Sequence, residues 1–455
     1  MSRAEEAGLN TRGLLGRLAS VEPLVFEGQV TQVVGTLVEA EVPGAALGTV
    51  CEIDSTQGTP ILAEVVGFRG ARNLLMPFHD LVGIGHGSRV RPVRRETTVP
   101  VGRELLGRVL GPLGEPIDGK GPLGCGDQAR LHREAPDPLL RTRVGEQLGT
   151  GVRAIDTMLA LGKGQRVGIM AGTGVGKSTL LGMVARNVQS DVNVIALIGE
   201  RGREVREFIE EILGEEGMAR SVVVVVTGDA SPILRVKGAL VATTIAEAFR
   251  DDGLDVMLMM DSITRLAMAQ REIGLAAGEP PTSRGYTPSV FAMLPRVLER
   301  CGNNDRGSLT GIYTVLVEGD DMNDPIADAT RGILDGHIVL TRELASRNHF
   351  PAIDVLKSVS RVMKDIVDPQ QVIDAGELRD VLATWADAEE LVNIGAYRPG
   401  SNAGIDRALR LIGPVRDFLR QGVGEVAVGQ ESLLALAELA LAAREPVGAA
   451  DGGKQ

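Results

Sequence analysis

A glycine-rich segment at residues 171–179, Ala-Gly-Thr-Gly-Val-Gly-Lys-Ser-Thr, has the residue types and spacing of a phosphate-binding loop. Its glycines allow a tight turn in which successive N–H groups point at phosphate oxygens, and the N-terminus of the following helix favours negative charge. Lys177 would contact the β- and γ-phosphates, and the Ser178 hydroxyl would ligate Mg²⁺. Ala171 stands where the strict pattern has glycine, a replacement that some such loops accept. The predicted nucleotide-binding residues are Gly172, Thr173, Gly174, Val175, Gly176, Lys177, Ser178 and Thr179.

Two carboxylates follow apolar runs further along the chain, Glu200 after one and Asp261 after another. An acid at the tip of a buried strand beside a phosphate-binding loop can hold Mg²⁺ or its water shell, which suits Asp261. Glu200 could orient and polarise the attacking water. Its local pattern is equally compatible with a charged helix start, in which it pairs with Arg201 or Arg203. Together these residues predict hydrolysis of a nucleoside triphosphate, MgATP, with Lys177 solvated when no nucleotide is bound.

The elements that position these residues alternate between strand and helix. Continuous apolar runs at 167–170, 194–198, 222–226 and 256–260 are typical of strands buried on both faces of a parallel sheet. Helical stretches at 177–188 and 240–250 lie between them. This alternation predicts an α/β nucleotide-binding domain of the P-loop, RecA-like kind.

The flanking segments have other patterns. Short β-rich runs separated by turn signals predict a small β-barrel, glycine and proline interrupt the next stretch, and amphipathic leucines predict a C-terminal helical domain. The predicted parts are an N-terminal partner-binding segment (1–22), a β-barrel (23–98), a connector (99–145), the ATPase domain (146–375), a helical domain (376–442) and a disordered tail (443–455).

Bulk properties limit the possible function classes. The formal charge of −12 is unfavourable for non-specific binding of nucleic acid, so no nucleic-acid partner is expected. The cysteines, Cys51, Cys125 and Cys301, are far apart and odd in number, which indicates neither a disulfide framework nor a metal site. No signal peptide or membrane-spanning run is visible. We therefore expect a cytoplasmic protein that reaches a membrane through partners.

With these motifs in place, the chain resembles the catalytic ATPases of type III protein export, and among them the flagellum-specific ATPase. These enzymes are similar to the β subunit of the rotary ATP synthase. The resemblance runs from about residue 30 to residue 430. Its specific stretches are residues 171–179, 198–204, 257–265, 278–300 and 308–361. It implies a homohexamer with nucleotide sites between subunits.

The resemblance also implies roles for single residues. Glu200 is similar to the residue that activates water, and Arg201 beside it is assigned to the nucleotide-binding set. Arg361, within Ser-Val-Ser-Arg-Val, matches the arginine finger that enters a neighbouring subunit's site. Phe350 stands where the family usually has the tyrosine that stacks on adenine, and stacking needs only a ring face. Val423 falls where the synthase β subunit has a second aromatic residue, so base discrimination is expected to be looser.

Further partners are implied in the same way. Residues 278–286 resemble the loop that faces the central stalk, although a rigid surface loop would explain their prolines equally well. Residues 1–20, with leucines near helical spacing, are expected to bind a stator or regulatory protein. Export substrates, their chaperones and the membrane export gate complete the set. The implied work is release of substrates from chaperones and their unfolding.

Four alternatives remain. Residues 317–323 and 334–340 favour an export ATPase over a rotary synthase subunit, and residues 335–340 with 348–355 favour the flagellar branch over a virulence injectisome. An RNA-translocating terminator would need a barrel with exposed aromatic and basic residues, whereas residues 23–93 hold only three aromatic residues. A scaffold that binds nucleotide without turnover would not need Lys177, Glu200 and Arg361 intact.

Overall fold

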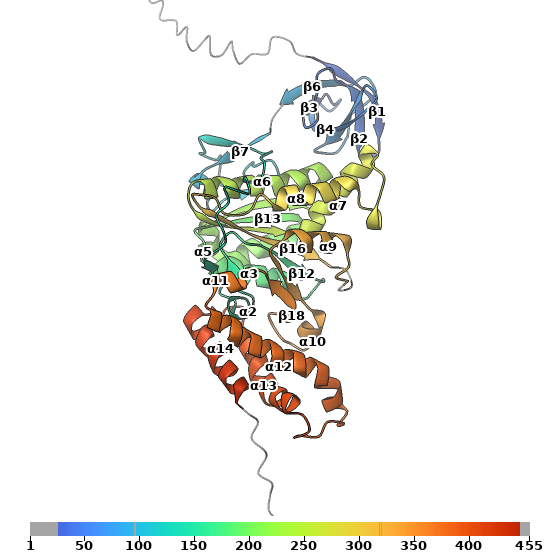
Figure 1. The fold of residues 1–455 in the computed structure, drawn as a ribbon. Coiled ribbons are helices and arrows are strands. Elements are labelled where there is room, and N and C mark those ends of the chain that lie inside the picture. The colour runs from blue at the N-terminus through green and yellow to red at the C-terminus, as the bar shows by residue number, and fades with distance from the viewer. Residues whose placement is uncertain (1–25, 95–96, 318, 320, 446–455) are drawn as a thin grey trace, which may run out of the picture. The chain divides into compact units, whose positions relative to one another are not determined.

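A computed structural model describes residues 26–94, 97–317, 319 and 321–445. The chain divides into two compact units, residues 1–96 and 97–455 (Figure 1). The predicted partner-binding segment, residues 1–22, lies outside the described residues, as does the chain from residue 446. The first residues of the predicted disordered tail, 443 and 444, instead lie in helix α14 (Gly429–Arg444). Among the described residues, no helix is long and apolar enough to cross a membrane.

The first unit is a closed six-stranded antiparallel barrel, as predicted. Its strand order is β1-β2-β5-β4-β3-β6. Alternate residues of these strands point inward, and Val38, Cys51, Ala63 and Leu75 are fully buried in its core. The strands are β1 (Gly28–Val34), β2 (Leu37–Glu41), β3 (Val50–Ile53), β4 (Ile61–Arg69), β5 (Arg72–Pro77) and β6 (Arg89–Arg94).

The second unit is built on an eight-stranded sheet in the order β18-β17-β12-β16-β15-β13-β14-β8. Every neighbouring pair is parallel except β17 and β18, which are antiparallel. The mostly parallel sheet of the predicted P-loop core is confirmed. The strands are β8 (Val109–Leu110), β12 (Arg166–Ala171), β13 (Val192–Glu200), β14 (Ser221–Thr227), β15 (Asp255–Asp261), β16 (Ser308–Leu316), β17 (Gly336–Leu340) and β18 (Ile353–Ser360).

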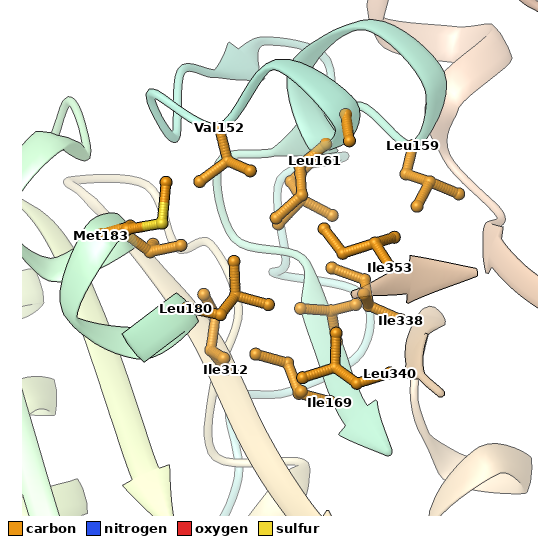
Figure 2. Close-up of a cluster of buried hydrophobic side chains, with 14 of the residues drawn as sticks. Val152, Leu159, Leu161, Ile169, Leu180, Met183, Ile312, Ile338, Leu340 and Ile353 are labelled. Carbon is orange, nitrogen blue, oxygen red and sulfur yellow. The ribbon is translucent and has the colours of Figure 1, made fainter. Parts of the chain in front are cut away.

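Helices cover both faces of this sheet. Helices α6 (Pro232–Asp251), α7 (Ile263–Ala277) and α8 (Pro288–Leu298) lie on one face, and α3 (Lys177–Asn187) and α5 (Gly214–Ala219) lie on the other (Figure 1). Leu180 and Met183 of α3 point into a cluster formed with Ile169 of β12 and Ile312 of β16 (Figure 2). This cluster fixes the helix that follows the phosphate-binding loop against the strand that precedes it.

The segment expected to be a connector contains regular structure. Strand β7 (Thr98–Val101) pairs with β9 (Asp127–Arg130), and β8 forms one edge of the large sheet by pairing with β14. A two-residue strand is too short to produce a periodic signal in a sequence rich in glycine and proline, which is why the sequence did not indicate it.

Three long helices form the C-terminal region of the same unit. They are α12 (Pro369–Asn393), α13 (Ala403–Leu419) and α14 (Gly429–Arg444), and they pack on one another and on α2 (Arg153–Met158) (Figure 1). Helix α12 passes through residue 375, where the sequence suggested a boundary. The remaining elements are η1 (Arg103–Leu105), β10 (Gln147–Leu148), β11 (Leu161–Gly162), α4 (Gly202–Glu207), η2 (Phe208–Leu213), η3 (Ser283–Gly285), α9 (Pro325–Ile333), α10 (Arg342–Ser346) and α11 (Met363–Ile366).

Candidate nucleotide-binding and catalytic site

The phosphate-binding loop joins the end of β12 to the start of α3, which is the context its motif requires. Gly174 and Gly176 have φ values of 78° and 91°, a left-handed region that favours glycine. Thr173 and Gly174 are exposed at the tip of the loop. The backbone N–H of Val317 donates to the carbonyl of Ala171 at 3.0 Å, so the neighbouring strand holds the base of the loop.

Lys177 contacts two carboxylates. Its Nζ lies 2.5 Å from Oδ1 of Asp261 and 3.8 Å from Oε1 of Glu200. Only 12% of its side chain is exposed, so the expectation that this lysine is solvated without nucleotide is wrong. The reason is the sheet: the carboxyl ends of parallel strands β12, β13 and β15 meet at one edge, and a cation there attracts both acids.

Asp261 has a second partner that the sequence did not reveal. The hydroxyl of Thr314, on neighbouring strand β16, donates to Oδ1 of Asp261 at 2.6 Å. In the strand register, Met260 lies opposite Tyr313, which brings the next residue of each strand together. Thr314 lies within an apolar strand, two residues before its end, so its hydroxyl was the only signal that the sequence offered for this contact.

Glu200 faces the loop lysine and not the arginines beside it in the sequence. Burial raises its pKa to about 7, with the charge of Asp261 as the second cause, while Lys177 opposes the shift and Glu204 adds to it. Arg201 and Arg203 have nitrogens 3.6 and 3.8 Å from Oε1 of Glu204. The alternative in which those arginines neutralise Glu200 is therefore not what the structure has.

The two acids and the loop serine share one cavity. Ser178, Glu200, Glu204 and Asp261 all line it, together with apolar residues of η2. Among the described residues, no group of three or more histidine, cysteine or acidic side chains could hold a metal ion by itself. Mg²⁺ at nucleotide sites usually has one or two protein ligands beside phosphate and water oxygens, so Ser178 and Asp261 are a chemically suitable pair.

Arg265 is a residue that sequence reasoning missed. Its aliphatic stem packs on Gly199, where an added β-carbon would lie 3.0 Å from Cβ of Arg265. It lines a second cavity, of about 550 Å³, with Thr173 of the loop and Arg271. The sequence could have indicated Arg265 through its position four residues after Asp261. Helix α7 begins at the edge of the sheet, so its first turn lies close to the site.

The two residues assigned to the adenine lie near the loop helix. A β-carbon on Gly176 would lie 3.7 Å from Cδ1 of Phe350, so the phenyl ring borders the phosphate-binding loop. The carbonyl of Val423 accepts a hydrogen bond from Arg186 of α3 at 2.8 Å. Both side chains are partly solvent-exposed. The structure thus brings both residues to the helix that carries the loop.

Arg361 lies elsewhere. Its N–H donates to the carbonyl of Asp335, and the N–H of Asp335 donates to the carbonyl of Arg166, at the first residue of β12. The loop begins at the other end of that strand, five residues or about 17 Å away at the rise of a β-strand. Arg361 is exposed, donates to the carbonyl of Arg331 at 3.2 Å, and makes no ion pair with Asp365, both being described residues.

The fold and these contacts define a P-loop nucleoside-triphosphatase with an added β-barrel and helical region. Residues 151–360 match the nucleotide-binding domain of the ATP synthase alpha/beta family, and residues 30–94 match its beta-barrel domain. Residues 367–438 match the C-terminal domain of the type III secretion ATPase EscN.

Similar proteins narrow the class further. The "Flagellum-specific ATP synthase" of Bacillus subtilis is 51% identical over 434 residues, 95% of this chain and 99% of that protein. The "Type 3 secretion system ATPase" of Xanthomonas euvesicatoria is 54% identical over 407 residues, 89% and 92% of the two chains. The assembled ATPase EscN of the enteropathogenic E. coli type III secretion system superposes with a TM-score of 0.88 at 43% identity, covering 91% of this chain and 100% of that one.

The chain therefore belongs to the family of flagellar and type III secretion ATPases. It is an ATPase, and the resemblance inferred from its motifs is confirmed.

Proposed function

We propose that this chain hydrolyses MgATP at the interfaces of a homohexamer and thereby energises flagellar type III protein export. The observation that carries the proposal is the convergence of Lys177, Glu200 and Asp261 on the phosphate-binding loop. These are a cation for the phosphates, a general base and a ligand for the metal's coordination shell, gathered at one edge of one sheet.

Each group has a distinct task. Incoming phosphates would draw Lys177 from Asp261, because the γ-phosphate carries more charge than a single carboxylate. Glu200, whose pKa is about 7, can accept a proton from water near neutral pH. Mg²⁺ supplies charge neutralisation at the phosphates, and Ser178 and Asp261 are the residues that would hold it.

The position of Arg361 supports completion of the site by a second subunit. The backbone of Arg361 is bonded beside the start of β12, about 17 Å along the sheet from the loop at its other end, which is farther than an arginine side chain extends. Arg361 is exposed and free of carboxylate partners among the described residues, so it can enter a neighbour's site. EscN, the similar ATPase, is known as an assembly.

The partners follow from the family. EscN forms a complex with its central stalk EscO, and residues 278–286 are the loop we assign to such a stalk. The loop is held in shape, since Thr282 donates to the carbonyl of Tyr286 at 2.6 Å and Arg284 pairs with Asp321 at 2.5 Å. Residues 1–22 would bind the stator protein, which would connect a cytoplasmic hexamer to the membrane export gate. There the hexamer would meet export substrates and the chaperones that carry them.

A non-flagellar secretion role is the second candidate, favoured by the 54% identity to the Xanthomonas protein. Deletion of the gene in its host decides between the two. Loss of filament assembly with normal secretion of other proteins supports the flagellar role, and the reverse supports the injectisome.

Two variants test the site itself. Lys177→Ala should lower hydrolysis at least about 10²-fold, because the loop would lose its charge at the γ-phosphate.

Glu200→Gln keeps shape and hydrogen-bonding capacity, so it should leave MgATP affinity near normal while turnover falls by about 10²-fold or more. Steady-state hydrolysis and equilibrium nucleotide binding measure both. Retention of more than about a tenth of the rate by Lys177→Ala would rule out the assigned site.

A further inference from the structure

A buried glutamine connects the two segments that carry Phe350 and Val423, the residues assigned to the adenine. Gln421 lies between α13 and α14 and is only 5% exposed. Its Oε1 accepts the N–H of Arg153 at 2.8 Å, and its Nε2 donates at 2.8 Å to the carbonyls of Gly151 and Glu425. Its backbone N–H donates to the carbonyl of Phe350 at 2.9 Å. One residue therefore connects the start of α2, the segment that carries Phe350 and the loop at residues 420–428.

The loop at residues 420–428 carries Val423, the second residue assigned to the adenine. The carbonyl of Val423 is held by Arg186 of α3, and the N–H of Ala427 donates to the carbonyl of Gly151 at 3.1 Å. Arg153 adds bonds to the carbonyls of Phe418 and Arg420. Phe350 and Val423 are far apart in the sequence, and Gln421 is where their segments are bonded to each other.

We propose that Gln421 is a positioning residue that sets the strength of base binding without affecting phosphate binding. The inference rests on the proposed ATP site. The loop at residues 171–179 is held by β12, β16 and the core beneath α3, and no bond of Gln421 reaches it. The side-chain amide bonds the loop at residues 420–428 to Gly151 and Arg153, while the backbone N–H of Gln421 holds the carbonyl of Phe350. Removing the amide should therefore let this loop shift, and with it Val423 and the backbone contact to Phe350, and leave the phosphate-binding geometry as it is.

The chain offers a matched control for a merely structural role. Gln371 of α12 is also buried, at 7% exposed, and its Nε2 donates to the carbonyls of Asp156 and Thr157 at 3.0 and 3.2 Å. It thus bonds to the same helix α2 through the same kind of amide. It has no hydrogen bond to Phe350 or to the loop at residues 420–428 within the described part of the chain.

The experiment compares ATP with tripolyphosphate, which has the phosphates and no base. For the full chain, the KM for ATP, the kcat and the competitive inhibition constant of tripolyphosphate are measured in wild type, Gln421→Met and Gln371→Met. Methionine keeps the length and burial of glutamine and removes its three side-chain hydrogen bonds, while the backbone N–H bond to Phe350 remains. Gln421→Met should raise the KM for ATP about fivefold to tenfold, the loss expected from one or two buried hydrogen bonds, with kcat and the inhibition constant changed less than about twofold. Gln371→Met should not raise the KM for ATP without an equal change in the inhibition constant of tripolyphosphate.

The proposal is wrong if ATP and tripolyphosphate weaken by the same factor, if neither weakens, or if Gln371→Met shows the same selective loss. Lys177→Ala is expected to be nearly inactive, so its affinities for ATP and tripolyphosphate are measured by equilibrium binding. Both should weaken, so failure of the ATP site itself is recognised separately. If Gln421→Met does not fold, hydrogen exchange of the wild-type chain decides. Saturating ATP should protect residues 148–153, 348–352 and 419–427, and equal protection by tripolyphosphate would contradict the proposal.

Discussion

At the scale of single residues, the site is a balance of three charges. Lys177 is the only cation among them, and it lies closer to Asp261 than to Glu200. Glu200 is consequently under-neutralised, and burial adds to the cost of its charge. A carboxyl group with a pKa near 7 exchanges protons at the pH of the cell, as a general base must.

The first prediction concerns this pKa. A protonated Glu200 cannot accept a proton from water, so kcat/KM for MgATP should rise with pH through about 7, the pKa in the free enzyme. Glu204→Gln removes a neighbouring acid that raises the pKa of Glu200, so its rising limb should move to lower pH. The pH dependence of kcat/KM at saturating Mg²⁺ measures both. The titration of ATP itself is the same for wild type and Glu204→Gln, so it cannot cause a difference between them. If the rising limbs of kcat/KM coincide for the two proteins, Glu200 does not set the pH dependence.

At the scale of elements, the loop depends on the helix that follows it. An 11-residue helix such as α3 is marginally stable by itself, so it depends on the packing of its apolar face. That face packs against residues of β12 and β16 (Figure 2). Leu180, one turn after Lys177, is 1% exposed in that cluster. The position of the lysine is therefore determined by core packing as much as by the glycines before it.

The second prediction tests this dependence. Leu180→Ala should lower the free energy of unfolding by about 2–5 kcal/mol, from lost burial and the cavity that remains. Leu275→Ala, on the surface of α7 where the leucine is 44% exposed, should change it by less than about 0.5 kcal/mol. Urea denaturation followed by circular dichroism compares the two. Equal effects would show that the cluster beneath α3 is not what stabilises the helix.

At the scale of the whole molecule, the direction of the strands separates Arg361 from the phosphate-binding loop. The loop, Glu200 and Asp261 lie at the carboxyl ends of parallel strands, while antiparallel β18 returns the chain to the opposite end before Arg361. If Arg361 is the finger that we propose, one subunit cannot bring all the groups of a site together. Activity is then expected to depend on assembly, because an isolated subunit would lack the guanidinium for its own γ-phosphate.

The third prediction is complementation between inactive subunits. An arginine finger contributes about 10³–10⁵ in rate in related phosphoryl transfers, so Arg361→Ala should be nearly inactive. Lys177→Ala should also be inactive. In mixed hexamers, an Arg361→Ala subunit that faces a Lys177→Ala neighbour has every group, and hydrolysis should partly return. The readout is the ATPase rate across mixing ratios.

Formation of mixed hexamers is verified with two affinity tags. If they form and no activity returns at any ratio, the finger does not act between subunits. An Arg361→Ala protein with the normal rate would remove the finger altogether.

The fourth prediction concerns the N-terminal segment. Deleting residues 1–20 should leave hydrolysis intact and weaken binding to the stator protein, because the loop and the described core that supports it are formed by residues from Leu148 onward. Gel filtration of the two proteins together reports the complex. An unchanged complex would count against the assignment.

The sequence by itself determined the parts of the site that are contiguous in the chain. The loop at residues 171–179 carries its own turn, cation and hydroxyl, and the apolar runs before Glu200 and Asp261 indicate buried strands whatever surrounds them. The barrel could be predicted for the same reason, since its strands are short, local and separated by turns. Family resemblance added roles for Phe350 and Arg361, but not their positions.

The tertiary structure alone decided which of these groups touch. Lys177 and Asp261 are 84 residues apart, and their contact depends on the order of strands in the sheet, which no local pattern encodes. The same holds for Thr314 beside Asp261, for the hydrogen bond from the N–H of Gln421 to the carbonyl of Phe350, and for Arg361 near the start of β12. Local sequence fixes backbone conformation within an element, whereas proximity between elements is set by how their apolar faces are buried together, a property of the whole unit.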